Sequence, residues 1–226
     1  MKQSEQSTVA SQRVADVVAE RILAGHLKPG DRIKQDELAT ELNLSRIPVR
    51  DALRILETRG LVSLRANAGA RVASLTTRDM ELSYQIRELL EPMLLAESIP
   101  HLTEADFAEM GEVKAALEEV ADADAYMPLA RRFHWIAFRG HQVPLLAQIV
   151  ERLWDTTHHY RRAYAVLALR NAELREVMRA ERDLLFGAIV RREVDLAPRL
   201  LGIHIRRTHI GLLDNADVLD DGDAQS

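Results

Sequence analysis

Three arginines recur at four-residue intervals near the end of the first quarter of the chain. Arg46, Arg50 and Arg54 would form one stripe along a helix. The neighbouring face of that helix would carry the apolar residues Val49, Ala52, Leu53 and Leu56. A guanidinium group can donate two hydrogen bonds to guanine or clamp a phosphate, so the pattern predicts a helix that enters the major groove of DNA. The alternative is an ordinary amphipathic helix with a solvated arginine face.

The segments around this stripe supply the other parts of a DNA-binding domain. Helices are predicted at residues 11–24, 35–42 and 46–59, with Ser45 as the N-cap of the third. Pro29-Gly30 predicts a turn, and Gly25 and Gly60 end helices.

A short hairpin is predicted over residues 61–74 after the third helix. It places Arg65 and Arg71 around Gly69, from where they could reach the DNA backbone or the minor groove. Three helices followed by a hairpin predict a winged helix-turn-helix domain over residues 11–75, preceded by a disordered tail at 1–10.

Composition and charge narrow the class of protein further. The 226 residues carry a net charge of −5. Residues 1–75 hold 12 Lys+Arg against 9 Asp+Glu, a balance of +3, so the remainder has a balance of −8. A basic first third favours a polyanionic partner, although a chance imbalance of surface charge is the alternative. The chain has no cysteine, which excludes disulfides and thiolate metal sites. It also has no long apolar run and no signal-peptide pattern, so we expect a cytoplasmic protein without membrane contact.

The rest of the chain is predicted to be helical throughout. Helices are expected near residues 77–99, 103–121, 125–138, 143–167, 171–192 and 194–213. The fold class is therefore mainly α, with the winged domain followed by an all-α bundle of six or seven helices over residues 76–217. Residues 218–226 are predicted to form a disordered tail.

The run LKPGDRIKQDELATELNLSRIPVRDALRILETRGLV resembles the DNA-binding domain of the GntR family of bacterial transcription regulators. The resemblance implies that Ser45, Arg46, Arg50 and Gly69 contact DNA. Relatives present a basic residue from the second helix, but Asp36 stands there in this chain, so no contact is assigned to it. The motif Y-x-I-R-x-x-L-E from Tyr84 to Glu91 is similar to the start of the FCD branch, whose helical domain binds a small effector.

Many FCD domains hold a divalent metal with one aspartate and three histidines, and this chain departs from that pattern. The corresponding positions are Ala130, His134, Arg182 and His204. Two imidazoles beside a guanidinium make a poor metal site, so we expect no cofactor, with His134 and His204 as the ligands if a metal binds.

Arg182 is instead predicted to anchor the carboxylate of a small metabolite, with Arg87 as a second candidate. His134 and His204 are expected to donate hydrogen bonds to that carboxylate, more strongly once protonated below about pH 6.5. The alternatives are a core role for His134, a glutamate partner such as Glu151 or Glu91 for Arg182, and a metal site restored by Glu181 or Asp183.

These features predict a ligand-responsive transcription regulator rather than an enzyme, because the sequence shows no nucleophile–base pair, phosphate loop or complete metal set. The expected partners are a palindromic operator in double-stranded DNA, a small carboxylate metabolite and a second copy of the chain. Repression, released by the metabolite, is the expected mode. The alternatives are a helical protein-interaction module and a small hydrolase.

Overall fold

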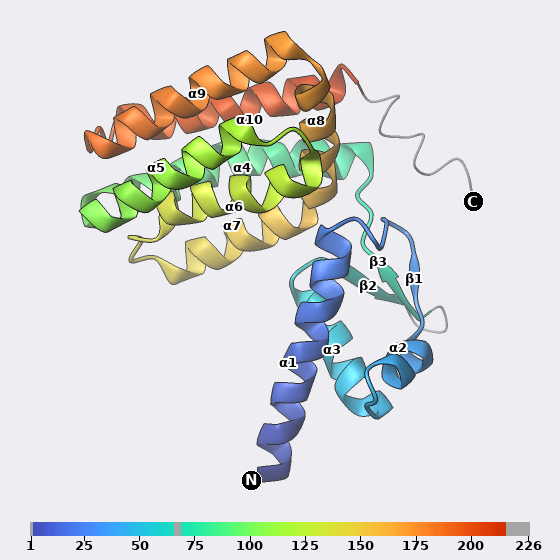
Figure 1. Cartoon of the computed structure of the whole chain (residues 1–226). Helices are drawn as coiled ribbons and strands as arrows, with labels where there is room; N and C mark the ends of the chain where they lie inside the picture. Colours follow the sequence, from blue (N-terminus) through green and yellow to red (C-terminus); the bar gives the residue numbers. More distant parts are fainter. Residues whose placement is uncertain (1, 66–68, 216–226) are drawn as a thin grey trace. The chain divides into compact units, whose positions relative to one another are not determined.

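The computed structural model describes residues 2–65 and 69–215 (Figure 1). Contacts between residues divide the chain into two compact units. Unit 1 comprises residues 1–76 together with 151–159, and unit 2 comprises residues 77–150 together with 160–226. Among the described residues, no helix is both long enough and apolar enough to cross a membrane.

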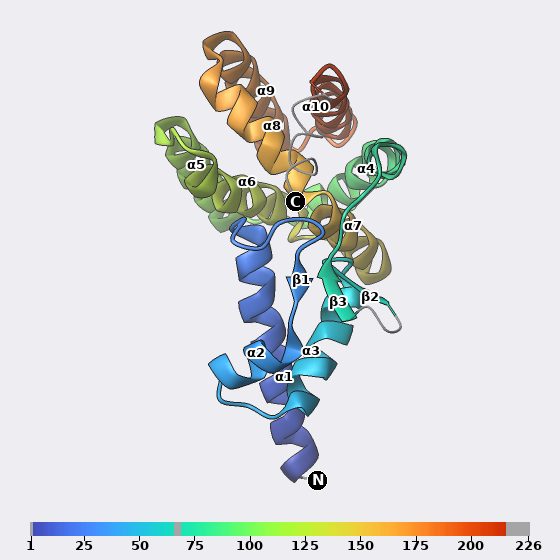
Figure 2. The same ribbon diagram turned by 90° about the vertical axis from the view of Figure 1, so that its right-hand side faces the viewer.

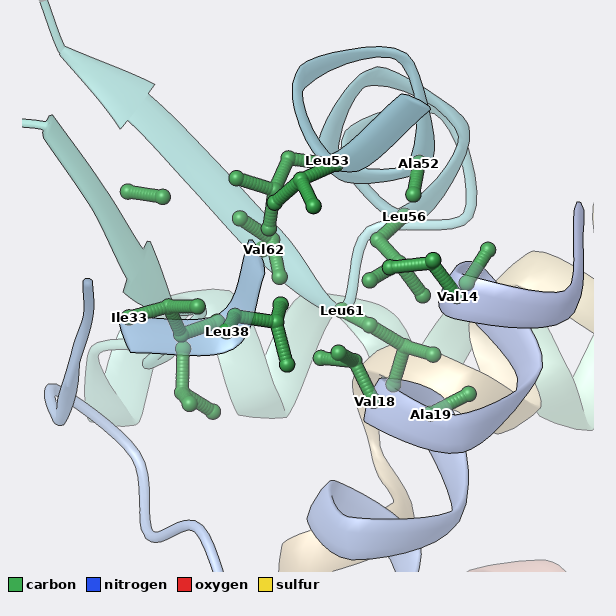
Figure 3. Close-up of a cluster of buried hydrophobic side chains, with 14 of the residues drawn as sticks. Val14, Val18, Ala19, Ile33, Leu38, Ala52, Leu53, Leu56, Leu61 and Val62 are labelled. Carbon is green, nitrogen blue, oxygen red and sulfur yellow. The ribbon is translucent and has the colours of Figure 1, made fainter. Parts of the chain in front are cut away.

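Unit 1 contains the predicted winged helix-turn-helix. Its elements are α1 (Lys2–Leu23), β1 (Arg32–Ile33), α2 (Gln35–Glu41), α3 (Arg46–Thr58), β2 (Val62–Arg65) and β3 (Gly69–Val72). Figure 3 shows how one apolar core joins these elements, with Val14 and Val18 of α1 facing Leu56 of α3 and Leu61 before β2. Because the apolar face of α3 is used in this core, its opposite face is left to solvent.

The wing is a three-stranded antiparallel sheet in the order β1–β3–β2. The β2–β3 hairpin confirms the prediction, with Val62 opposite Val72 and Arg65 opposite Gly69. Gly69 has a φ of +77°, a conformation that favours glycine where the hairpin enters β3. Residues 66–68 of the predicted hairpin lie outside the described residues. Strand β1 was not predicted, because two residues after a turn carry too little alternation to show a strand.

Helix α1 begins much earlier than the sequence suggested. The tail predicted at residues 1–10 is wrong over residues 2–10, which are helical and continue without a break to Leu23. The segment is polar but contains neither glycine nor proline. Once the buried part of α1 is packed, each added residue extends an existing helix without the cost of nucleation. The tail predicted at 218–226 lies outside the described residues.

The described chain after the winged domain is helical. Its elements are α4 (Thr77–Ser98), a 3₁₀ turn (Ile99–His101), α5 (Glu104–Glu119), α6 (Ala123–Phe138), α7 (Pro144–Thr156), α8 (His158–Arg170), α9 (Ala172–Val190) and α10 (Leu196–Leu213). All belong to unit 2 except the end of α7 from Glu151 and the start of α8 up to His159, which are assigned to unit 1. Thr103 is the N-cap of α5 and forms a capping box with Asp106. Figure 2 shows α4 and α10 side by side, and Gly202 of α10 lies against Pro92 of α4.

The single helix predicted at 143–167 is wrong, because the chain forms α7 and α8 instead. The break falls at two consecutive threonines, Thr156 and Thr157. Both hydroxyls donate to the carbonyl of Leu153, at 3.3 and 2.5 Å. Such side-chain bonds compete with the regular backbone ladder, and β-branched residues already weaken a helix.

Candidate functional sites

The outer face of α3 presents the predicted arginine stripe to solvent. Arg46, Arg50 and Arg54 are all exposed, whereas Val49 and Leu53 are fully buried. Ser45 is the N-cap of α3 and has the extended backbone of that position. Its hydroxyl makes no capping bond there, so it is available at the N-terminal end of the helix. The three cations and this hydroxyl therefore lie on the face that a major groove would meet.

An acidic residue of α2 contacts the first arginine of this stripe. The Nε of Arg46 lies 2.6 Å from Oδ1 of Asp36, and both side chains are mostly exposed. Ile47 lies beside them and exposes 58% of its surface. The sequence showed that Asp36 breaks the basic pattern of relatives, but the ion pair depends on the angle between α2 and α3 and could not be predicted.

The basic residues of the wing differ in whether their side chains also contact the backbone of the domain. Arg65 is exposed at the end of β2, next to Gly69 in the ladder. Arg71 donates a hydrogen bond of 2.7 Å to the carbonyl of Gly30, so its guanidinium also holds the turn before β1. Arg32 stands opposite Arg71 in the β1–β3 ladder and is exposed. Sequence reasoning missed Arg32, although the Asp-Arg-Ile sequence after the Pro-Gly turn offered a signal.

Unit 2 contains a cavity of about 310 Å³, a volume that includes its open mouth. Its polar lining residues are Tyr126, His134, Glu181, Arg182 and His204, and its apolar lining residues are Leu117, Ala130, Phe133 and Leu185. Three of the four residues assigned to the effector from sequence thus line one cavity.

The carboxylate in this cavity is already neutralised by its neighbours. Nε and Nη2 of Arg207 each donate to Glu181 at 2.5 Å, and Nδ1 of His204 lies 2.8 Å from Oε2. Burial alone would raise the pKa of Glu181, but the hydrogen bonds from His204 and Arg207 outweigh it and lower the pKa to about 2. Glu181 is therefore an ionised member of an ion pair, and Arg207 is further held by the Tyr164 hydroxyl.

Arg182 has a neutral partner in the same cavity. Its Nη2 donates a hydrogen bond of 2.9 Å to the hydroxyl of Tyr126, and its guanidinium lies over the Tyr126 ring at 5.7 Å. No pairing with Glu151 or Glu91 is seen among the described residues. Because Glu181 is already paired with Arg207, which is not a lining residue, Glu181 does not balance the positive charge of Arg182.

His134 is held as a neutral imidazole. Its Nδ1 lies 2.8 Å from the carbonyl of Ala130, which fixes Nδ1 as the donor. Burial lowers the pKa of His134 to about 3, and the neighbouring His204, Arg87 and Arg161 act in the same direction. The expectation that His134 becomes protonated below pH 6.5 is therefore wrong. The sequence could not show how many cations surround it.

Arg87 lies apart from the cavity lining. Its Nε donates to Oε1 of Glu91 at 2.5 Å, and its guanidinium lies 4.7 Å from the centre of the Tyr84 ring. Both Arg87 and Glu91 are buried, at 4% and 0% exposure. The structure thus gives the second predicted anchor a carboxylate partner within its own helix.

The donor atoms of the cavity do not fit a divalent metal. Glu181 is occupied by Arg207 and His204, Ala130 offers only a methyl group, and Arg182 repels a cation. Within residues 2–65 and 69–215, no three His, Cys, Asp or Glu side chains form a metal-binding group. The alternative in which Glu181 or Asp183 restores the site is not supported, since Asp183 is exposed and pairs with Lys114 at 2.6 Å.

Comparison with known families agrees with both units. Residues 10–72 match the model described as bacterial regulatory proteins of the gntR family, and residues 81–207 match the FCD domain. The chain belongs to the GntR family, in the branch with an FCD domain. It is therefore a DNA-binding transcription regulator, with the winged domain in unit 1 as the DNA-binding part.

Individual relatives support the same assignment. The transcriptional regulator McbR of Escherichia coli is 29% identical over 73% of this chain and 75% of its own length. The regulator YdhC of Bacillus subtilis is 28% identical over 62% of this chain, and the match spans 64% of YdhC. The solved structure of E. coli McbR covers 92% of this chain and 98% of its own, with a TM-score of 0.80 at 25% identity. These relatives are transcription regulators, which favours a regulator over the hydrolase considered above.

Proposed function

We propose that this GntR-family regulator is a homodimeric repressor that binds a palindromic operator and is released by a small organic acid. The observation that carries the proposal is Arg182, which lines the cavity with a tyrosine hydroxyl as its hydrogen-bond partner. A guanidinium presents paired N–H groups that match the two oxygens of a carboxylate. The proposal does not require a metal, because the charge of Arg182 takes the place of the cation.

The neighbouring groups favour an anionic ligand over a cationic one. Glu181 cannot attract a cation strongly, since Arg207 and His204 already satisfy both of its oxygens. His134 is neutral and carries no charge to repel either sign. The apolar wall of Leu117, Phe133 and Leu185 would cover the carbon skeleton of the acid.

To change transcription, the proposed ligand must favour one arrangement of the two winged helix-turn-helix domains of the dimer. A coupling free energy of about 1–3 kcal/mol would change operator affinity roughly 5–150-fold. Because several GntR relatives are named as repressors, among them GlaR of E. coli, we take release from DNA as the direction of the response.

A thermal-shift screen with a panel of organic acids, followed by gel shifts on the promoter beside the gene, tests the proposal. An acid present at 100 times its Kd adds about 2.7 kcal/mol to the free energy of unfolding. The same acid should weaken the gel shift of the wild-type protein. If only neutral or apolar compounds stabilise the protein, the proposed ligand class is wrong.

Two variants separate the role of Arg182 from general effects of charge. Arg182→Ala should abolish both the thermal shift and the release from DNA, while leaving DNA binding without ligand unchanged. Arg179→Ala removes an exposed arginine of the same helix that pairs loosely with Glu118, and should respond like the wild type. Elemental analysis of protein purified without a metal column should find no stoichiometric zinc, nickel or manganese.

A further inference from the structure

One large apolar side chain stands on the exposed face of α3. Ile47 exposes 58% of its surface, whereas the other large apolar residues of α3 are buried or packed against the core of unit 1. A single exposed apolar residue is ordinary on a protein surface. What distinguishes Ile47 is its place in the first turn of α3, between the exposed arginines Arg46 and Arg50.

The direction of its side chain places Ile47 at the centre of that face. The core face of α3 is formed by Val49, Ala52, Leu53 and Leu56. At about 100° of rotation per residue, Ile47 projects within roughly 20° of the direction opposite the mean of these four residues. Arg50 lies about 70° and Arg46 about 110° from the same direction. Within the first two turns of α3, the residue that points most directly away from the core is therefore apolar.

The major groove offers an apolar side chain one kind of partner. The base edges on its floor present hydrogen-bond donors and acceptors, and the C5-methyl group of thymine is the apolar group among them. Residues at the N-terminal end of a helix in the groove are the ones that contact base edges. Ile47 is the second residue of α3, and its branched side chain has few rotamers to lose on binding.

The neighbouring arginine determines where along the DNA this contact would fall. Ile47 and Arg50 are three residues apart on α3, so their Cβ atoms are about 5–6 Å apart on adjoining parts of the helix surface. Successive bases of one strand are about 3.4 Å apart along the DNA axis. The base pairs that face the two side chains are therefore separated by at most about two steps.

We propose that Ile47 is a specificity-determining residue of this regulator, and that its side chain packs against the C5-methyl group of a thymine within about two base pairs of the guanine that Arg50 contacts. This inference rests on DNA binding by α3, and it requires neither the effector nor the homodimer proposed above. Ile47 adds a preference for thymine over cytosine, because cytosine lacks the methyl group.

Replacement of thymine by uracil removes only that methyl group and gives the first test. Duplexes that the wild-type protein selects from a random DNA pool are synthesised with thymine or with uracil throughout, and the Kd of each is measured. Burial of one methyl group corresponds to about a fourfold change in affinity. The wild type should therefore bind the uracil duplex about fourfold more weakly for each half-site, whereas Ile47→Ala should bind both duplexes with nearly equal affinity.

Two further variants control this comparison. Ile47→Val keeps a branched apolar side chain and should retain most of the sensitivity to the methyl group. Val9→Ala removes a side chain of α1 that is similarly exposed, at 62%, and should respond like the wild type. The proposal is overturned if the wild type and Ile47→Ala lose equal affinity on uracil, because the methyl groups would then act through DNA shape. A wild type that ignores uracil, or that selects sites without an invariant thymine, would also overturn it.

Single substitutions in the selected duplex test the register. Uracil placed at one thymine at a time should locate the methyl group that Ile47 contacts. 7-Deazaguanine lacks the N7 acceptor of guanine, and it should weaken binding of the wild type but not of Arg50→Ala at the guanine that Arg50 contacts. The two positions should lie within about two base pairs of each other. A larger separation, or the absence of such a guanine, would refute the placement of Ile47 next to the Arg50 contact.

Discussion

The buried neutral histidine makes the stability of the protein depend on pH in a defined direction. An unfolded chain protonates His134 near pH 6.5, whereas the folded protein does so only near pH 3. Between these values the unfolded state binds more protons, so the free energy of unfolding falls as the pH falls below 6.5. The stability is fully present above pH 6.5.

The magnitude follows from the shift in pKa. Each unit corresponds to about 1.4 kcal/mol, so a fall from pH 8 to pH 5 should remove at most about 2 kcal/mol through His134. This free-energy change is an upper limit, because the cavity leaves part of the His134 imidazole accessible to solvent. Glu181 contributes nothing in this window, since its stabilising charge is lost only when the pH falls below about 4.5 and toward 2.

Urea unfolding at pH 8 and pH 5 measures this effect in the wild type and in His134→Asn. The asparagine keeps an N–H donor for the Ala130 carbonyl but does not titrate. Its free energy of unfolding should therefore fall by about 2 kcal/mol less than that of the wild type over this range. His101→Asn, which removes an exposed histidine, controls for loss of an imidazole as such. Equal pH dependence in the wild type and His134→Asn would refute the reasoning, as would an NMR titration of His134 near pH 6.5.

Further expected outcomes concern the DNA-binding face and the cavity. Arg46→Ala and Arg50→Ala should each cost about 1–3 kcal/mol of operator binding if the arginine contacts a base, which gel shifts at physiological salt would show. Asp36→Asn should release Arg46 for a phosphate contact and so raise the affinity for unrelated DNA. The plot of log binding constant against log salt concentration should then steepen by roughly 0.9 per chain. An unchanged slope would contradict the idea that Asp36 keeps Arg46 from contacting a phosphate. Ala130→Asp combined with Arg182→His should create a metal site with the two remaining histidines, detectable as zinc binding by calorimetry that the wild type lacks.

The winged domain could be predicted because its signals are local. Glycine, proline and the N-cap serine mark the ends of its helices, and the period of apolar residues sets the buried face of α3. Strand β1 has no such signal, since its two residues become a strand only by pairing with Arg71 and Ala70 far along the chain. The same holds for the contact of Asp36 with Arg46, which joins two helices across a turn.

The cavity could be predicted only in its outline. The family pattern assigned His134, Arg182 and His204, which the fold brings to one lining. It did not show that Arg207 neutralises Glu181, although Arg207 follows His204 by three residues and so shares its face of α10. Nor could it show the Tyr126 partner of Arg182, which comes from another helix.

Helix α4 shows why periodicity alone could not separate its two faces. Its sequence repeats apolar residues on opposite sides, so either side could have been assigned to the core. The charged residues Arg87 and Glu91 would have indicated that their face of α4 is exposed to solvent. They lie four residues apart, however, and are buried together as an ion pair. Once that pair faces inward, Leu82, Ile86, Leu89 and Met93 must face outward. The apolar outer face of α4 is thus a consequence of burying an ion pair within the helix.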